Sequence, residues 1–461
     1  MKVIKIGGGC LRGKDNISHI LEQVEQRGRG HVFVVSALNG VTDHLLNSMD
    51  KALEDEEQIP GIIGQLRQEH LGVAGYICAD EEQLSSYARD LEYHLREIER
   101  LFYGLNFTRE ITLRLKDVVC SYGERLSAEL LSFALNQKSV SATYCLPHKI
   151  GLLTDGKYGD ATALVSKTSK LMPEHVQQLL EDKEIVIIPG FYGVSEQGEI
   201  TTFGRGGSDY SAAVIAVALG AEVLEIWKDV AGYMSADPRY VPEAKLIQKL
   251  SYEEAAELSY FGAKILHPRT MEPLRRSKIA VSIRNTFKPE TPGSVVSSRS
   301  PRVASVIKSV AHDQDIGILK VHGSGVGARP GILAQVASQL TTEGINIKSV
   351  VTSQTCISFL LAHKDLEAGR TALKGLRPKP FRRLGKVEDV SLVSIVGEGL
   401  AQRKGIAANC FEAVKNCGVN VEMISFGPSR VALYFLVRNK DLQKTLTSIH
   451  SMFFGTATRC A

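Results

Sequence analysis

The stretch Thr201-Thr-Phe-Gly-Arg-Gly-Gly-Ser-Asp-Tyr-Ser211, with the apolar run 212–219 directly after it, decides the fold of this chain. Its glycines surround Arg205, and Ser208 and Asp209 open a segment rich in helix formers. This pattern predicts a turn that presents backbone N–H groups at a helix N-terminus, where an anion can bind. Glycines that serve only a tight turn are the simpler alternative.

Two short apolar runs flank this segment. Residues 184–190 before it and 222–229 after it have the composition of buried parallel strands. Strand, glycine loop, helix and strand form a βαβ unit, the building block of an α/β sheet. The loop matches neither the P-loop nor the dinucleotide-binding pattern, so those generic motifs do not assign its ligand.

Two more predicted strands come earlier in the chain, and each ends near small or hydroxyl residues. Residues 2–6 contain Lys5 and run into Gly7-Gly8-Gly9, and residues 31–38 lead into a turn with Thr42. Ligands of open α/β sheets bind at the carboxyl ends of the strands. A lysine beside glycines that let the backbone approach closely favours a phosphate, although a glycine turn after a first strand is common.

The pattern from about Leu45 to Leu135 is helical, with many charges on solvated faces. Within it, Gly123-Glu124-Arg125 places a carboxylate and a guanidinium beside a predicted cleft, and a capping glutamate with a surface arginine explains it equally well. Further on, residues 228–239 leave a strand through turn residues of both charge signs, a pattern that can hold ribose and phosphates.

The last part of this region contains a helix end and a strand. Lys264 is a candidate phosphate contact, although a lone lysine usually faces solvent. His267, before Pro268, is predicted to be a helix-terminal residue rather than a ligand or base. Residues 279–285 are predicted to be the final strand of the region.

Composition limits the function classes. The chain has 461 residues, 44% hydrophobic and 23% charged, with a net charge of +4, which fits an ordinary globular protein of about three domains. This charge is too mild to indicate nucleic acid or an anionic membrane as a partner. The eight cysteines are scattered without zinc-site spacing, and neither a signal peptide nor a membrane span is predicted. We expect a cytoplasmic protein with reduced thiols.

A linker and an internal repeat organise the rest of the chain. A segment rich in Pro, Ser and Thr predicts a linker over 291–304 after a first domain over 1–290. The residues that recur at a constant offset of 74 are Gly323, Gly325, Gly331, Ala334, Gly344 and Asn346, matched by Gly397, Gly399, Gly405, Ala408, Gly418 and Asn420. Each copy has a βαββ pattern, so we predict two α+β modules over 305–385 and 386–461, whose last segment could return to the first. Paired modules of this kind offer clefts for a small ligand, which favours a sensor.

In their order and spacing, these motifs resemble those of the aspartokinases over essentially the whole chain. The matching segments are Val35–Thr42, Gly123–Ala128, Phe203–Tyr210, Trp227–Val230, Ala236–Arg239 and Tyr260–Pro268. The repeat is similar to the tandem ACT domains of that family. The resemblance implies an α/β amino-acid-kinase fold, an open sheet sandwiched by helices, followed by two ACT-like regulatory modules. It also implies ATP, Mg²⁺ and conversion of L-aspartate to 4-phospho-L-aspartate, the first step toward lysine, threonine and methionine. We expect a monofunctional enzyme and a homodimer joined through the ACT modules.

The resemblance also implies roles for individual residues. The expected nucleotide contacts are Lys5, Gly7, Gly8, Lys228, Asp229, Tyr233, Arg239 and Lys264. The expected aspartate contacts are Thr42, Glu124, Arg205, Ser208 and Asp209. Lys5, Arg205, Asp209 and Lys264 form the expected catalytic set, and no metal-ligand cluster is predicted. Because the aspartate carboxylate is already ionised, transfer needs alignment of two anions and charge stabilisation rather than a general base.

Three departures from the family pattern affect the nucleotide contacts. Gly9-Cys10 stand where the family usually has Thr-Ser, and Lys228 stands where threonine is common. Met234 replaces a frequent tyrosine, with Tyr233 one position earlier. Lys228 is therefore a hypothetical contact to phosphate or ribose.

The expected effector cleft lies in the first ACT-like module. Its predicted contacts are Gly325, Asn346, Ile347, Thr352 and Gln354. A lysine-sensitive enzyme would be expected to offer acidic residues here, whereas this stretch holds Lys348 and Gln354. This composition favours threonine over lysine, or an enzyme without strong inhibition.

Two alternatives remain open on sequence alone. One is a kinase of a related carboxylate such as glutamate or aminoadipate, because one methylene gives little discrimination. The other, motivated by the departures, is a catalytically weak amino-acid sensor or partner subunit.

Overall fold

The computed structural model describes residues 1–263, 265–298 and 306–455. The chain divides into two compact units, which we describe separately. Unit 1 comprises Met1–Tyr233, Gln248–Ala256 and Ile265–Ser300, and unit 2 comprises Met234–Ile247, Glu257–Lys264 and Pro301–Ala461. No described helix is long and apolar enough to cross a bilayer.

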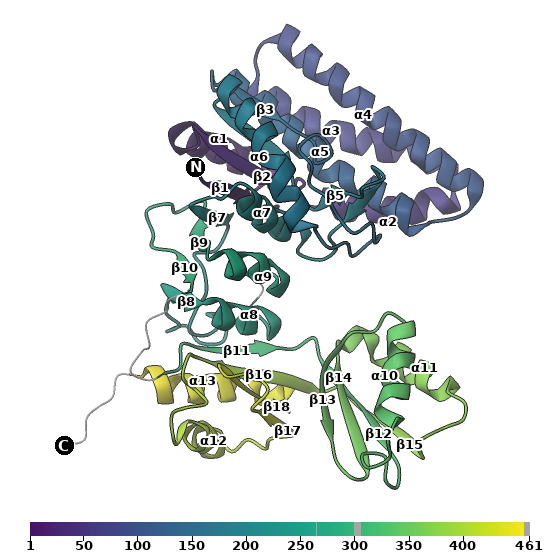
Figure 1. The fold of residues 1–461 in the computed structure, drawn as a ribbon, viewed down its shortest axis with the longest axis vertical. Coiled ribbons are helices and arrows are strands. Elements are labelled where there is room, and N and C mark those ends of the chain that lie inside the picture. The colour runs from purple at the N-terminus through teal and green to yellow at the C-terminus, as the bar shows by residue number, and fades with distance from the viewer. Residues whose placement is uncertain (264, 299–305, 456–461) are drawn as a thin grey trace, which may run out of the picture. The chain divides into compact units, whose positions relative to one another are not determined.

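Unit 1 is built on an eight-stranded sheet in its described residues (Figure 1). Its strands, in spatial order, are β3 (Ala142–Tyr144), β4 (Ile185–Pro189), β2 (His31–Val35), β1 (Val3–Ile6), β7 (Val223–Lys228), β9 (Ala280–Asn285), β10 (Ser294–Ser297) and β8 (Lys249–Ser251). Neighbouring strands from β3 to β9 are parallel, whereas β10 runs antiparallel to β9. The parallel strands therefore place their carboxyl ends along one edge, where ligands of such sheets bind.

Helices cover both faces of this sheet. They are α1 (Gly13–Arg27), α2 (Val41–Glu54), α3 (Ile59–Ile77), α4 (Glu81–Thr108), α5 (Leu113–Gln137), α6 (Val165–Asp182), α7 (Gly207–Ala218), α8 (Tyr252–Tyr260) and α9 (Pro268–Ser277). The predicted helical region is confirmed as α2 to α5, and α3 and α4 pack side by side (Figure 1). Ile4 and Ile6 of β1 join the core formed with α1 to α5. Because side chains alternate along a strand, Lys5 points to the opposite face, toward α7.

The structure corrects the prediction that residues 279–285 form the last strand of this region. β10 follows within the segment predicted as a linker, and pairs with both β9 and β8. Its sequence, Ser294-Val-Val-Ser297, is too short and polar to stand out between Pro, Gly and Ser residues. A hairpin of β5 (Tyr192–Val194) and β6 (Ile200–Thr202) precedes α7 and was also not predicted.

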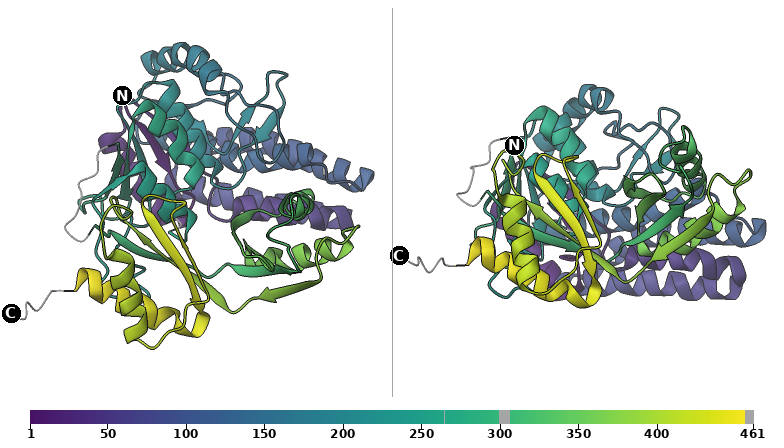
Figure 2. Two further views of the ribbon diagram at one scale, coloured as in Figure 1. Left: turned by 60° about the horizontal axis from the view of Figure 1, so that its bottom comes forward. Right: turned by 90° about the horizontal axis from the view of Figure 1, so that it is seen from below.

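Unit 2 contains two four-stranded sheets in its described residues, each with its own helices (Figure 2). The first consists of β12 (Gly317–His322), β13 (Ile347–Thr352), β14 (Cys356–Leu361) and β15 (Arg383–Val387), with α10 (Ile332–Thr342) and α11 (Leu366–Gly375). The second consists of β11 (Ser309–Asp313), β16 (Val390–Val396), β17 (Met423–Phe426) and β18 (Ala432–Arg438), with α12 (Ile406–Asn416) and α13 (Leu442–Phe454).

The two modules are less contiguous than the predicted ranges. β11 precedes the first module in the chain, yet it pairs with β16 of the second sheet. β15 completes the first sheet and crosses the predicted boundary at residue 385. α13 packs on β11 and β16, so the last helix stays with the second module. The βαββ pattern identifies each repeat but does not say which sheet accepts the flanking strands.

The recurring glycines of the repeat have a common physical reason. Gly331 and Gly405 precede α10 and α12 with φ values of 86° and 87°, and Gly344 and Gly418 follow these helices with φ values of 67°. Left-handed backbone of this kind favours glycine because it carries no Cβ. The two modules therefore begin and end their first helix in the same way.

Candidate active site

Charged side chains meet where β1 and β7 end beside the N-terminus of α7. Lys5 Nζ lies 2.7 Å from Asp209 Oδ1, and Lys228 Nζ lies 3.4 Å from Asp209 Oδ2. Lys5 and Asp209 are only 5% and 7% exposed. Burial alone would raise the pKa of Asp209, but the two ammonium groups outweigh it and lower that pKa. Asp209 is therefore an ionised carboxylate that holds two lysines at the edge of the sheet.

A second buried carboxylate, Glu124 of α5, lies against the first turn of α7. Ser208 Oγ donates a hydrogen bond to Glu124 Oε1 at 3.1 Å. The backbone N–H of Ala37 also donates to this carboxylate. Its second oxygen, Oε2, is buried and has no partner among the described residues. Burial raises the pKa of Glu124 to about 8, because its hydrogen bonds and the nearby charge of Lys5 do not offset the loss of solvation.

The glycines after β1 lie tightly against neighbouring strand ends. Gly7 N–H donates to the Trp227 carbonyl at 3.0 Å. A Cβ at Gly8 would lie 3.3 Å from the Ala37 carbonyl oxygen, and one at Gly9 would lie 3.3 Å from Asp229 Oδ2. The loop is therefore in contact with the ends of β2 and β7. Asp229 is exposed beside it, as a nucleotide contact requires.

The loop that carries Arg205 depends on glycine for its shape. Gly204 and Gly206 have φ values of 70° and 74°. A Cβ at Gly206 would lie 2.4 Å from His267 Cβ, so no other residue fits there without displacing α9. Arg205 itself is exposed and forms no ion pair with a described residue, which leaves its guanidinium free for a substrate anion.

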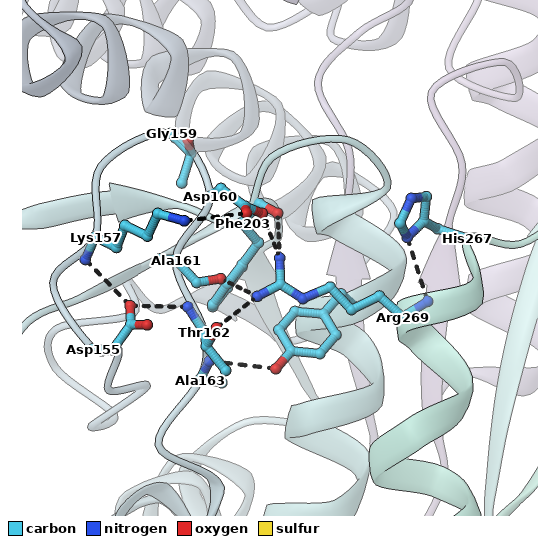
Figure 3. A network of polar contacts seen from close by, with 12 residues as sticks. Asp155, Lys157, Gly159, Asp160, Ala161, Thr162, Ala163, Phe203, His267 and Arg269 are labelled. Carbon is cyan, nitrogen blue, oxygen red and sulfur yellow. Dashed lines mark hydrogen bonds and ion pairs between the residues drawn. The ribbon is translucent and has the colours of Figure 1, made fainter. Parts of the chain in front are cut away.

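Arg269, which the sequence analysis did not single out, anchors this loop (Figure 3). Its Nη1 donates to Asp160 Oδ1 at 2.9 Å and to the Phe203 carbonyl at 3.0 Å. Its Nη2 donates to Thr162 Oγ1 at 3.0 Å and to the Ala161 carbonyl. The guanidinium also lies 4.5 Å from the ring centroid of Tyr210 in α7.

The N-terminus of α9 positions Arg269. His267 is the N-cap of α9, and its Nδ1 accepts a hydrogen bond from the Arg269 N–H at 3.4 Å, as Figure 3 shows. This confirms the prediction that His267 is a helix-terminal residue. The tripeptide His267-Pro268-Arg269 is the sequence signal that could have drawn attention to the arginine, since proline at the first helical position sets the helix direction.

The remaining predicted residues of unit 1 are placed as follows. Thr42 Oγ1 lies 3.4 Å from the position of a Cβ at Gly123, so its hydroxyl packs against α5 at the residue before Glu124. Tyr233 is 1% exposed, its N–H donates to Ser294 Oγ at 2.9 Å, and its hydroxyl donates to the Ala255 carbonyl at 3.5 Å. The ring of Tyr233 is thus part of the core and offers no surface to a nucleotide in this conformation.

The other predicted residues lie in unit 2 or outside the described chain. Arg239 belongs to unit 2, where its Nη2 lies 2.6 Å from Asp237 Oδ2. Lys264 lies outside the described residues. All five predicted effector contacts lie in the first module. Gly325 is in the turn between β12 and α10, and the others lie on β13 or next to its ends: Asn346, Ile347, Thr352 and Gln354. Lys348 Nζ lies 2.6 Å from Asp313 Oδ2, so its charge is already paired.

Comparison with known proteins finds similar families and relatives for both units of the chain. The profile of the amino acid kinase family matches residues 1–285, and an ACT domain profile matches residues 319–375 and 393–453. Aspartokinase 2, chloroplastic, from Arabidopsis thaliana is 30% identical over 98% of this chain and 84% of its own length. The bifunctional aspartokinase/homoserine dehydrogenase of Haemophilus influenzae is 29% identical over 99% of this chain, which spans 57% of that protein.

Solved structures of E. coli aspartokinase III share the fold. The complex with aspartate and ADP, an R-state, has a TM-score of 0.83 and 27% identity, and covers 98% of this chain and all of the E. coli chain. The complex with lysine and aspartate, a T-state, has the same TM-score and identity. The described residues of the present chain contain no group of three His, Cys, Asp or Glu side chains placed to hold a metal ion.

Proposed function

The chain belongs to the aspartokinase family, and from that membership we propose that it transfers the γ-phosphoryl group of ATP to the side-chain carboxylate of L-aspartate. One observation supports this most strongly. The ion pair of Lys5 and Asp209 and the incompletely paired Glu124 lie together at the carboxyl edge of the sheet, around the N-terminus of α7. A site with a buried ammonium on one side and a buried carboxylate on the other suits a nucleotide phosphate and a substrate ammonium.

Each group has a distinct task in this account. Lys5, held by Asp209, stabilises the negative charge on the transferring phosphoryl group. Glu124 receives the ammonium of aspartate on its free Oε2, with Ser208 beside it and Thr42 against the preceding Gly123. Arg205 pairs with the α-carboxylate of the substrate, for which a guanidinium has suitable bidentate geometry. The side-chain carboxylate of aspartate then attacks without a general base, since it is already ionised.

The nucleotide would lie against the glycines after β1 and the end of β7. Gly7 and Gly8 permit close approach of phosphates. At the end of β7, Lys228 supplies a positive charge and Asp229 a negative one. Mg²⁺ bound with ATP would neutralise phosphate charge, and one or two carboxylates with the phosphates normally suffice to hold it. Asp229 fits that need, because it is exposed beside Gly9.

We further propose feedback by an amino acid and assembly through the ACT modules. The neutral side chains Asn346, Thr352 and Gln354 favour threonine, whereas the E. coli relative was solved with lysine. Strands β13 and β17 are equivalent sheet edges that expose Val350 and Phe426, which supports pairing of two copies. The seven described cysteines are all unpaired thiols, which supports a reducing cytoplasm.

Trapping of the acyl phosphate with hydroxylamine tests the proposal. Aspartate, glutamate and aminoadipate are compared in separate reactions, each with and without threonine or lysine. Hydroxamate formed from aspartate alone, and lost in Arg205→Ala, is the expected result. Product from another carboxylate would reassign the substrate. Binding of an amino acid without any turnover would support the sensor instead.

A further inference from the structure

A depression of about 570 Å³ lies away from the proposed active site, between α4, α5 and β3 of unit 1. We call it the α4–α5 depression. Its lining includes the carboxylates of Asp90 and Glu129 and four aromatic rings, and His94 is its only basic side chain among the described residues. Its volume falls in the range of small-molecule sites.

Glu129 is the most unusual group in the depression, because it is a buried carboxylate without a cation. The residue is 7% exposed, and the Tyr144 hydroxyl donates a hydrogen bond to its Oε1 at 3.5 Å. His94 Nε2 lies 3.5 Å from Oε2, but burial and Arg125 lower the pKa of His94, so the imidazole is neutral at neutral pH. Neither neighbour therefore compensates the charge of Glu129.

A second observation, independent of the carboxylates, points to a missing ligand. Tyr87 is 3% exposed and lines the depression, and its hydroxyl has no hydrogen-bond partner among the described residues. Buried hydroxyl groups are normally satisfied. The ring of Tyr87 stacks on Phe133 with centroids 4.7 Å apart, and this packing stabilises the position of its hydroxyl.

We propose that the α4–α5 depression binds a small organic cation, an ammonium or guanidinium group on a short apolar body. Glu129 and Asp90 would pair with the charge, the Tyr87 hydroxyl would complete its hydrogen bonds, and the aromatic rings would contact both the charge and the apolar body. A metal ion fits less well, because the described residues offer no cluster of three ligating side chains.

The protonation of Glu129 adds a pH dependence to this binding. Burial, with a further contribution from Asp90, raises the pKa of Glu129 to about 7. The other titratable groups that face it are His94 and Tyr87 on α4 and Tyr144 on β3, and all three are neutral near pH 7. Cation binding should therefore strengthen between about pH 6 and pH 8, as Glu129 ionises.

Calorimetric titration of the full chain tests the inference. The probes are 1,5-diaminopentane and agmatine, with 1,5-pentanediol as the uncharged match. We expect saturable binding of at least one cation, at least about tenfold weaker in Glu129→Gln. The glutamine keeps an oxygen to accept the Tyr144 hydrogen bond. Glu110→Gln, at an exposed position after α4, should bind like the wild type.

Two further variants keep the test decisive. Because Asp90 is exposed, Asp90→Asn should fold like the wild type. It should weaken cation binding and so keep the test valid even if Glu129→Gln does not fold. Tyr87→Phe should weaken it by a smaller factor. Absence of saturable binding for both cations at millimolar concentration would overturn the inference. So would equal affinity in Glu129→Gln and Glu110→Gln, or binding of the diol as strong as that of the diamine.

Discussion

Replacement of Glu124 by glutamine should make the protein more stable and less active at the same time. The wild-type carboxylate is buried with one oxygen unpaired, and we have proposed that this oxygen binds the substrate ammonium. Glutamine keeps the shape and can still accept the Ser208 hydrogen bond. It removes the charge, and with it both the cost of burial and the attraction for aspartate.

The stability change follows from the pKa of Glu124, which burial raises from 4.5 to about 8. The folded state therefore holds this proton more tightly than the unfolded state. The stability that this provides is complete below about pH 4.5 and is lost as the pH rises toward 8. At about 1.4 kcal/mol per pKa unit, the loss has an upper limit of about 5 kcal/mol. Glutamine does not titrate, so its stability should not fall in this window.

The activity change follows from the lost ion pair. A hydrogen bond to a charged group contributes about 1.5–3 kcal/mol, so the kcat/KM for aspartate should fall by at least about tenfold. Most of this loss should appear in the KM for aspartate, because the ammonium is distant from the phosphoryl transfer. The KM for ATP should change little.

Denaturant titrations at about pH 5 and pH 8, together with steady-state kinetics, measure both effects. Glu110→Gln is the matched control, because its carboxylate is exposed. At the same concentration, aspartate should stabilise the wild type more than Glu124→Gln. A variant that is less stable than the wild type at pH 8, or one with an unchanged KM for aspartate, would refute the reasoning.

Three further substitutions test other parts of the site. Arg269→Lys removes the planar fork that anchors the loop carrying Arg205 and should lower kcat/KM by about tenfold, whereas Arg276→Lys, an exposed position on the same helix, should not. Gly206→Ala, with φ of 74° and a clash at 2.4 Å, should cost more than about 2 kcal/mol in denaturant unfolding, and Gly220→Ala, with φ of 60° and open space, about 1 kcal/mol. Lys228→Thr should raise the KM for ATP about tenfold if this lysine contacts phosphate or ribose, and an unchanged ATP affinity would contradict that role.

Local sequence patterns were sufficient for five of the eight described strands of the sheet, β1, β2, β4, β7 and β9, and for the first contacts of the site. Short apolar runs that end in glycine marked β1 and β2, and side-chain alternation along β1 explains why Lys5 faces α7. The two similar ACT modules could be predicted from their recurring glycines. These glycines recur because left-handed backbone tolerates few other residues. β10 could not, because four residues of mixed polarity carry no periodicity that distinguishes a strand from a linker.

The parts of the site that escaped prediction depend on contacts between distant segments. Arg269 contacts residues 66 and 109 positions earlier in the chain, and no local pattern indicates such partners. Tyr233 was placed near the nucleotide by the motif spacing, but its ring is taken up by the core beside Ser294. The lack of a hydrogen-bond partner for Glu124 Oε2 likewise could not be predicted, because it depends on how α5 and α7 pack together.

The most direct test of the account is to observe the product itself. Phosphorus NMR of the protein with ATP, Mg²⁺ and L-aspartate should show an acyl phosphate resonance that grows as ATP is consumed and disappears on addition of hydroxylamine. Lys5→Met should abolish the signal while the protein remains folded. ATP consumption without an acyl phosphate, or a signal of equal size in Lys5→Met, would contradict the assignment of phosphoryl transfer to this site.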